Sequence, residues 1–82
     1  MSEFELLSIE QLRFKIRRGM LELDIILTRF LDNQYNTLSN EQRYVFQQLL
    51  AYEDPELWAW FFSGKLPPTP ELIDMVNCIK NE

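Results

Sequence analysis

The residues best suited to chemistry in this chain lie together in the stretch Arg17-Arg18-Gly19-Met20-Leu21-Glu22-Leu23-Asp24. Arg17 and Arg18 offer forked donors, and Glu22 offers an acceptor of the opposite charge. Gly19 lies between them and has no Cβ, so that another backbone can approach it closely. The combination suits charge-assisted hydrogen bonds to one partner loop. An ordinary corner between two helices remains the alternative interpretation.

The chain lacks the residue types that most catalytic and metal sites need. It has no histidine, which is the usual general base, metal ligand and partner of a nucleophile. Its one cysteine, Cys78, excludes an internal disulfide, and we interpret it as a small core or near-surface residue. Two isolated glycines cannot form a phosphate-binding loop. We therefore expect no enzymatic activity, no metal and no stably bound cofactor.

Neighbouring carboxylates are interpreted as solvated surface and not as an acid–base pair. Glu22 and Asp24, and likewise Glu53 and Asp54, are too close in sequence to project from one helix face.

Length and charge limit the classes of function that are open. The 82 residues suffice for one domain, 1–82, and the 46% hydrophobic content suits a compact core. The net charge of −5 argues against nucleic acid as partner, because phosphate contacts need a basic surface. A DNA-binding helix-turn-helix over 9–18 and 20–31 is disfavoured for the same reason.

The termini and hydropathy bear on location. No run reaches the length of a membrane span, and the acidic N-terminus lacks the pattern of a signal or transit peptide. We expect a monomer in a bacterial cytoplasm, without membrane insertion.

Two helices are predicted to position the charged stretch. Residues 1–8 are expected to be flexible, with Ser8 as N-cap of a first helix that ends at Gly19. The second helix follows over 20–31, with Glu22 near the positive end of its dipole. Its core stripe comprises Met20, Leu23, Ile26, Leu27, Phe30 and Leu31. Leu21 and Ile25 fall off this stripe and either pack against another helix or form an apolar rim beside Glu22.

The first helix also carries half of the chain's basic residues near its end. These are Arg13, Lys15, Arg17 and Arg18. A solvated helix end and a partner-binding patch are both compatible with this cluster.

Three further helices are predicted from caps and apolar spacing. Ser39 with Gln42 forms a capping box before the apolar residues Val45, Phe46, Leu49, Leu50 and Tyr52. Asp54-Pro55 is predicted as N-cap and first residue of a fourth helix that reaches about Phe62 and closes at Ser63-Gly64. Thr69-Pro70 begins a last helix that reaches about Lys80. The sequence therefore predicts an all-α fold, a small five-helix bundle in a single domain.

The aromatic residues of the fourth helix admit two interpretations. Leu57, Trp60 and Phe61 share one face, while Trp58 and Phe62 lie on another. A helix that is apolar nearly all round is usually buried centrally, and then both tryptophans belong to the core. The alternative is an exposed aromatic that docks a partner.

The stretch Arg18-Gly19-x-x-Glu22, followed by Leu23-Asp24, resembles the signature of the flavinylation factors of succinate dehydrogenase. The resemblance extends over about residues 10–80. Its other elements, in order, are Phe30, Tyr35, Leu38-Ser39, Glu41, Phe46, Leu49-Leu50, Asp54-Pro55, Leu57 and Trp60.

The resemblance implies a five-helix domain that promotes covalent attachment of FAD to a histidine of the succinate dehydrogenase flavoprotein subunit, and possibly of fumarate reductase. It implies a contact surface of Arg18, Gly19 and Glu22, with Arg17 and Met20 beside them. Asp54 and Pro55 carry over as structural caps. The chain would act as a chaperone, while the flavoprotein handles the FAD. A FAD carrier and a generic, antitoxin-like interaction module remain as alternatives.

Overall fold

The computed structural model describes residues 5–81, and within that range it contains helices and loops without a strand. Its elements are α1 (Ile9–Ile16), α2 (Leu21–Asn33), the 3₁₀ turn η1 (Tyr35–Thr37), α3 (Asn40–Leu49), α4 (Asp54–Phe62) and α5 (Pro70–Lys80). The predicted all-α class with five α-helices is confirmed.

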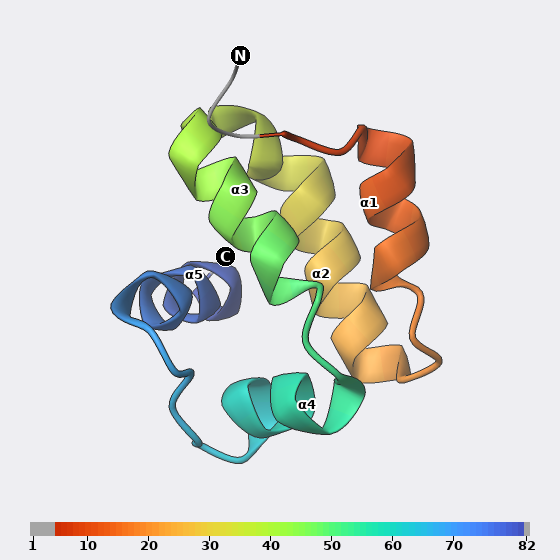
Figure 1. Cartoon of the computed structure of the whole chain (residues 1–82). Helices are drawn as coiled ribbons and strands as arrows, with labels where there is room; N and C mark the ends of the chain where they lie inside the picture. Colours follow the sequence, from red (N-terminus) through yellow and green to blue (C-terminus); the bar gives the residue numbers. More distant parts are fainter. Residues whose placement is uncertain (1–4, 82) are drawn as a thin grey trace.

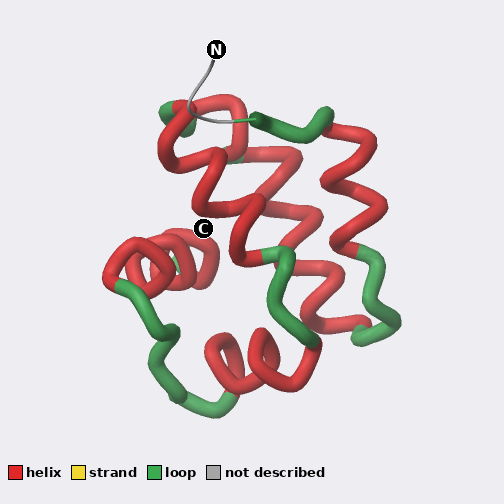
Figure 2. Tube along the Cα trace, viewed as in Figure 1, coloured by secondary structure: helices red, strands yellow, loops and turns green. Residues whose placement is uncertain are grey.

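Helix α2 is the element against which most of the chain packs. It contacts α1, η1, α4 and α5, while α3 and α5 contact each other. Figure 1 shows α1 beside α2 on one side of the molecule and α3 with α5 on the other. Helix α4 crosses one end of this arrangement, close to the first turn of α2. The loops before α2 and before α4 therefore lie at the same end, as the green segments of Figure 2 show.

The core is made of apolar side chains from all five helices. Phe30 of α2 and Phe46 of α3 meet at its centre, with ring centroids 5.5 Å apart. Among residues 5–81, no polar or charged side chain is fully buried. The remaining buried hydrophobic residues of the core are Leu12, Ile16, Leu23, Leu27, Leu31, Tyr35, Leu49, Leu50, Leu57, Trp60, Phe61, Leu72, Met75, Val76 and Ile79.

Three of the predicted helix starts are capped as expected. Ser8 and Ser39 each accept the backbone N–H of a glutamine three residues later, which completes two capping boxes. Thr69 accepts the N–H of Leu72 before Pro70 opens α5. Residues 1–4 of the segment expected to be flexible lie outside the described residues. Glu5 and Leu7 are non-helical, and their backbone groups bind the amide of Gln47 in α3.

Two predicted boundaries are wrong. Helix α1 ends at Ile16 and not at Gly19, because Arg17 has an extended backbone with φ −71° and ψ 96°. Helix α4 has Glu53 as N-cap, so that Asp54 is its first residue and makes no capping hydrogen bond. In both cases the cause is a contact, described below, between the α1–α2 loop and the α3–α4 loop. This contact draws the residues after Ile16 out of α1 and engages the side chain of Asp54.

The interpretation of α4 as a central helix is also wrong. Trp60 is buried, as predicted, but Trp58 is only half-buried and Phe62 is 43% exposed. The Trp58 and Phe62 rings lie 4.4 Å apart on the outer side of the helix. Helix α4 packs at the edge of the bundle and therefore buries one face only.

Candidate functional site

The connection between α1 and α2 consists of residues 17–20, which we call the corner. Gly19 has φ +81°, in the left-handed region that side chains other than glycine disfavour. A Cβ placed on Gly19 would meet no atom within 4 Å. The space in front of its backbone is therefore open, and the positive φ alone explains why glycine is needed for the turn.

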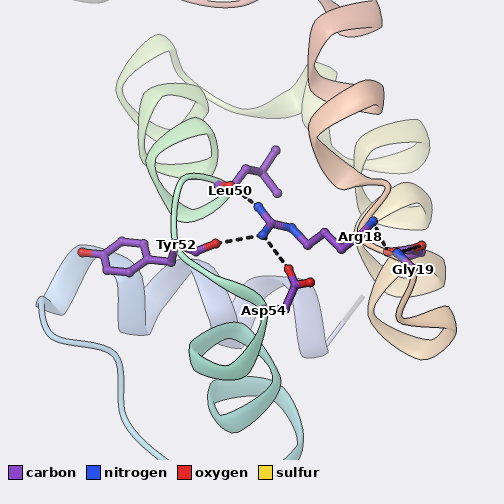
Figure 3. A network of polar contacts seen from close by, with 6 residues as sticks. Arg18, Gly19, Leu50, Tyr52 and Asp54 are labelled. Atoms are coloured by element: carbon purple, nitrogen blue, oxygen red, sulfur yellow. Dashed lines mark hydrogen bonds and ion pairs between the residues drawn. The ribbon is translucent and has the colours of Figure 1, made fainter.

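Arg18 does not point away from the corner but reaches across to the connection between α3 and α4, as Figure 3 shows. Its Nη1 donates to the carbonyl oxygen of Tyr52 and to Oδ1 of Asp54, each at 2.8 Å. Its Nη2 donates to the carbonyl oxygen of Leu50. Carbonyls beyond the end of a helix lack intrahelical partners and carry partial negative charge, which an arginine neutralises well. Arg18 thereby holds the two loops together.

The guanidinium of Arg18 is largely shielded from a second partner. The side chain is 12% exposed. Its Nε is buried and finds no hydrogen-bond partner within residues 5–81. The forked donor that the sequence predicted for a partner is used inside the molecule.

Asp24 holds the corner from the other side. Its Oδ1 accepts the backbone N–H of Arg18 at 3.1 Å, and its Oδ2 accepts that of Gly19 at 3.3 Å. Met20, the N-cap of α2, makes no capping hydrogen bond with its side chain. A carboxylate in the first turn thus binds the backbone that enters the helix, much as in a capping box.

Asp24 and Asp54 are the two residues whose roles the sequence reasoning missed. Both were interpreted as solvated surface carboxylates, and Asp54 also as a cap. The spacing of Asp24 from Gly19 resembles a reversed cap and could have been noticed. Asp54 gave no such signal, because its partner Arg18 is 36 positions away.

The remaining predicted site residues face outward or pack locally. Arg17 and Glu22 are exposed, and neither side chain makes a hydrogen bond or ion pair with another residue of the described chain. Met20 is half-buried and packs against the core. The structure thus brings the five predicted residues together, with Arg18 turned inward and Arg17, Gly19 and Glu22 accessible.

Neither a group of metal-ligating side chains nor a membrane-spanning helix is found among residues 5–81. Within 5–81 there is no group of three or more histidine, cysteine, aspartate or glutamate side chains placed to hold a metal ion. None of the helices in this range is long and apolar enough to cross a membrane. Cys78 is exposed on α5. The arrangement at the corner is therefore suited to contacts with another macromolecule, through an open backbone and unpaired charges of both signs.

Comparison with known proteins indicates one family. Residues 10–82 match the family model described as flavinator of succinate dehydrogenase. The FAD assembly factor SdhE of Shewanella oneidensis is 50% identical over 72 residues, which cover 88% of each chain. That of Idiomarina loihiensis is 43% identical over 93% of this chain and 84% of its own. That of Pasteurella multocida is 38% identical over 98% and 92%. No solved structure gives a significant match.

Proposed function

Because the chain belongs to the family of flavinators of succinate dehydrogenase, we propose that it binds the flavoprotein subunit of that enzyme through the outward side of the corner. It is an assembly factor that promotes attachment of FAD, and it is not itself an enzyme. The proposal concerns which surface makes the contact and what the contact does.

The division of the corner into an inward and an outward side carries the proposal. Arg18 and Asp24 are used within the molecule, so they fix the position of Gly19 before any partner arrives. Arg17 and Glu22 remain unpaired on either side of the open backbone of Gly19. A pre-organised surface of this kind spends little conformational entropy on binding.

The proposed action is that of a chaperone which orients groups of the partner. The family resemblance implies a histidine as the acceptor of the flavin, and we propose that it belongs to the flavoprotein, because this chain has no histidine. We propose that the FAD is held there too, with none bound stably by this chain. Binding that aligns a histidine with the flavin ring turns an infrequent encounter into a favoured geometry and lowers the barrier by orientation.

The proposal is tested by co-expressing the succinate dehydrogenase flavoprotein with and without this chain. Its covalently bound flavin is then measured by in-gel fluorescence. We expect a fluorescent covalent band that depends on the chain. Equal bands in both lanes would show that the flavoprotein is flavinylated without it.

The two glycines provide a matched pair of variants for the corner. Gly19 has φ +81° and Gly64 has φ +75°, and neither would place a Cβ within 4 Å of another atom. Gly19→Gln and Gly64→Gln should therefore suffer similar backbone strain, about 1–2 kcal/mol each. We expect Gly19→Gln alone to lose flavinylation, because only there does the side chain stand between the corner and its partner.

Circular dichroism distinguishes a contact role of Gly19 from a purely structural role in the turn. Retained helix content in both variants, with flavinylation lost only in Gly19→Gln, supports the contact. Unfolding of Gly19→Gln beside a folded Gly64→Gln would reduce Gly19 to a structural corner.

The second flavoprotein, the FAD-carrier alternative, the oligomeric state and the location are tested by separate measurements. The fumarate reductase flavoprotein can replace the succinate dehydrogenase subunit in the same gel assay. Flavin fluorescence that stays unchanged on titration with the isolated chain would rule out the FAD carrier. We also propose a cytoplasmic monomer, which sedimentation and cell fractionation test.

A further inference from the structure

Two large aliphatic side chains are exposed on α2 next to the corner. Leu21 is 69% exposed and Ile25 is 48% exposed. They are four residues apart and share the face of α2 opposite to Leu23 and Leu27, which are fully buried. Within residues 5–81, they form the only pair of exposed large hydrophobic side chains at this spacing in one helix. The rim beside Glu22 that the sequence left as one of two alternatives is therefore present.

Charges of opposite sign lie along the same face. Glu22 is three residues before Ile25 and Arg29 is four residues after it, so all three project to one side of α2. Both charged side chains are exposed, and neither forms a hydrogen bond or ion pair with another described residue. By contrast, Asp32 further along α2 pairs with Arg13 of α1. Glu22 and Arg29 are thus unpaired charged side chains beside Leu21 and Ile25.

The surface next to Ile25 is slightly hollowed. This shallow hollow is lined by Asp24, Ile25, Thr28, Arg29, Asp32 and Asn33. A partner side chain can enter there while the aliphatic groups of Leu21 and Ile25 enter the partner. Helices that bind in a groove use anchors at this spacing, three or four residues apart, with charged groups at the edges.

The position of this face indicates which partner covers it. Leu21 directly follows the corner in the chain, so a protein that approaches the backbone of Gly19 also comes close to Leu21. A phosphate-rich surface of nucleic acid or lipid is disfavoured by Glu22 and by the net charge of −5. What fits is a protein surface with an apolar pocket, a basic group opposite Glu22 and an acidic group opposite Arg29.

We propose that Leu21 and Ile25 are the apolar anchors of the interface with the flavoprotein subunit, and that Arg29 adds an ion pair at its edge. This inference rests on the proposed function and extends the contact from the corner along two further turns of α2. The flavoprotein accordingly presents an apolar pocket with an acidic side chain at the border that faces Arg29.

Leu21→Asp tests the apolar anchor against a closely matched control. Leu66, in the loop after α4, is 71% exposed, and Leu66→Asp makes the same change in shape and charge. Aspartate at position 21 occupies the first residue of α2, where the helix dipole favours it, so the fold should persist. We expect Leu21→Asp to raise the Kd for the purified flavoprotein subunit at least about tenfold, and Leu66→Asp to leave it unchanged.

Arg29→Glu tests the edge, and Lys80→Glu, at an exposed position of α5, is its control for net charge. We expect only Arg29→Glu to weaken binding, with an effect that shrinks as the salt concentration rises. Calorimetry of the subunit with each folded variant measures all four changes.

The outcomes distinguish this inference from the proposed function. No binding of the wild-type chain to the flavoprotein would contradict the function itself. Wild-type binding with unchanged Kd for Leu21→Asp would overturn the anchors while the corner contact stands. Equal losses in Leu21→Asp and Leu66→Asp would also overturn them, because the effect would then be one of charge alone.

Discussion

Arg17 and Arg18 are adjacent and chemically identical, yet they have different surroundings. Arg17 is exposed, whereas Arg18 donates to the carbonyls of Leu50 and Tyr52 and to one carboxylate at the start of α4. An extended backbone at Arg17 points successive side chains in opposite directions, which sends one arginine inward and leaves the other in solvent. Arg18 therefore positions the corner in the free protein.

Arg18→Ala should lower the free energy of unfolding by about 2–4 kcal/mol, since it removes charge-assisted hydrogen bonds and leaves the Leu50 and Tyr52 carbonyls unpaired. Arg17→Ala should change it by less than about 0.5 kcal/mol. Urea denaturation of both variants measures the difference. Similar stabilities would show that the contact with the α3–α4 connection contributes nothing in solution.

At the scale of elements, the corner is a junction of two loops and not merely a turn between two helices. Helix α1 stops early, and the residues it gives up let Arg18 span to the α3–α4 connection. Asp24 replaces a conventional N-cap at the start of α2. The first turns of α2 and α4 are held together in this way, and the proposed binding face lies along the outer side of α2.

Asp24→Ala should free the corner from α2. Loss of the acceptor for two backbone N–H groups should destabilise the protein by about 1–2 kcal/mol and speed hydrogen exchange at the amides of Arg18 and Gly19. Glu22→Ala is the control, because it removes an equal charge from the same helical turn without removing that acceptor. Faster exchange in Glu22→Ala as well would attribute the effect to the helix dipole.

At the scale of the whole molecule, stability depends on an apolar core and on few charged contacts. The chain has no histidine, and none of its fully buried side chains within 5–81 is charged. Tyr35 is a buried side chain that can ionise. Burial raises the pKa of its phenol above the ordinary value of 10.0, and the Arg43 guanidinium over its ring acts in the opposite direction.

The raised pKa of Tyr35 predicts a loss of stability in alkali. The unfolded chain releases the phenol proton at lower pH than the folded chain does, so ionisation favours unfolding. The contribution is intact below pH 10.0 and is lost as the pH rises through the folded pKa. Between about pH 9 and about pH 11, the free energy of unfolding should fall more in wild type than in Tyr35→Phe. Parallel falls in urea titrations at these pH values would assign the loss to other groups.

Local features of the chain were predictable because their causes are local. Ser8, Ser39 and Thr69 cap their helices through residues three positions away, and the apolar stripe of α2 faces the core as its spacing requires. Trp58 was misplaced because periodicity alone does not reveal whether a second element covers a face.

By itself the sequence determined the helical class, the start of most helices, the family and the need for glycine at position 19, all of which follow from neighbouring residues or a linear motif. Only the tertiary structure decided that Arg18 turns inward, that Asp54 pairs with it and that Leu21 and Ile25 stay uncovered. These facts depend on which segments meet in space. Sequence periodicity reveals neither a contact between residues 36 positions apart nor whether another element covers a helix face.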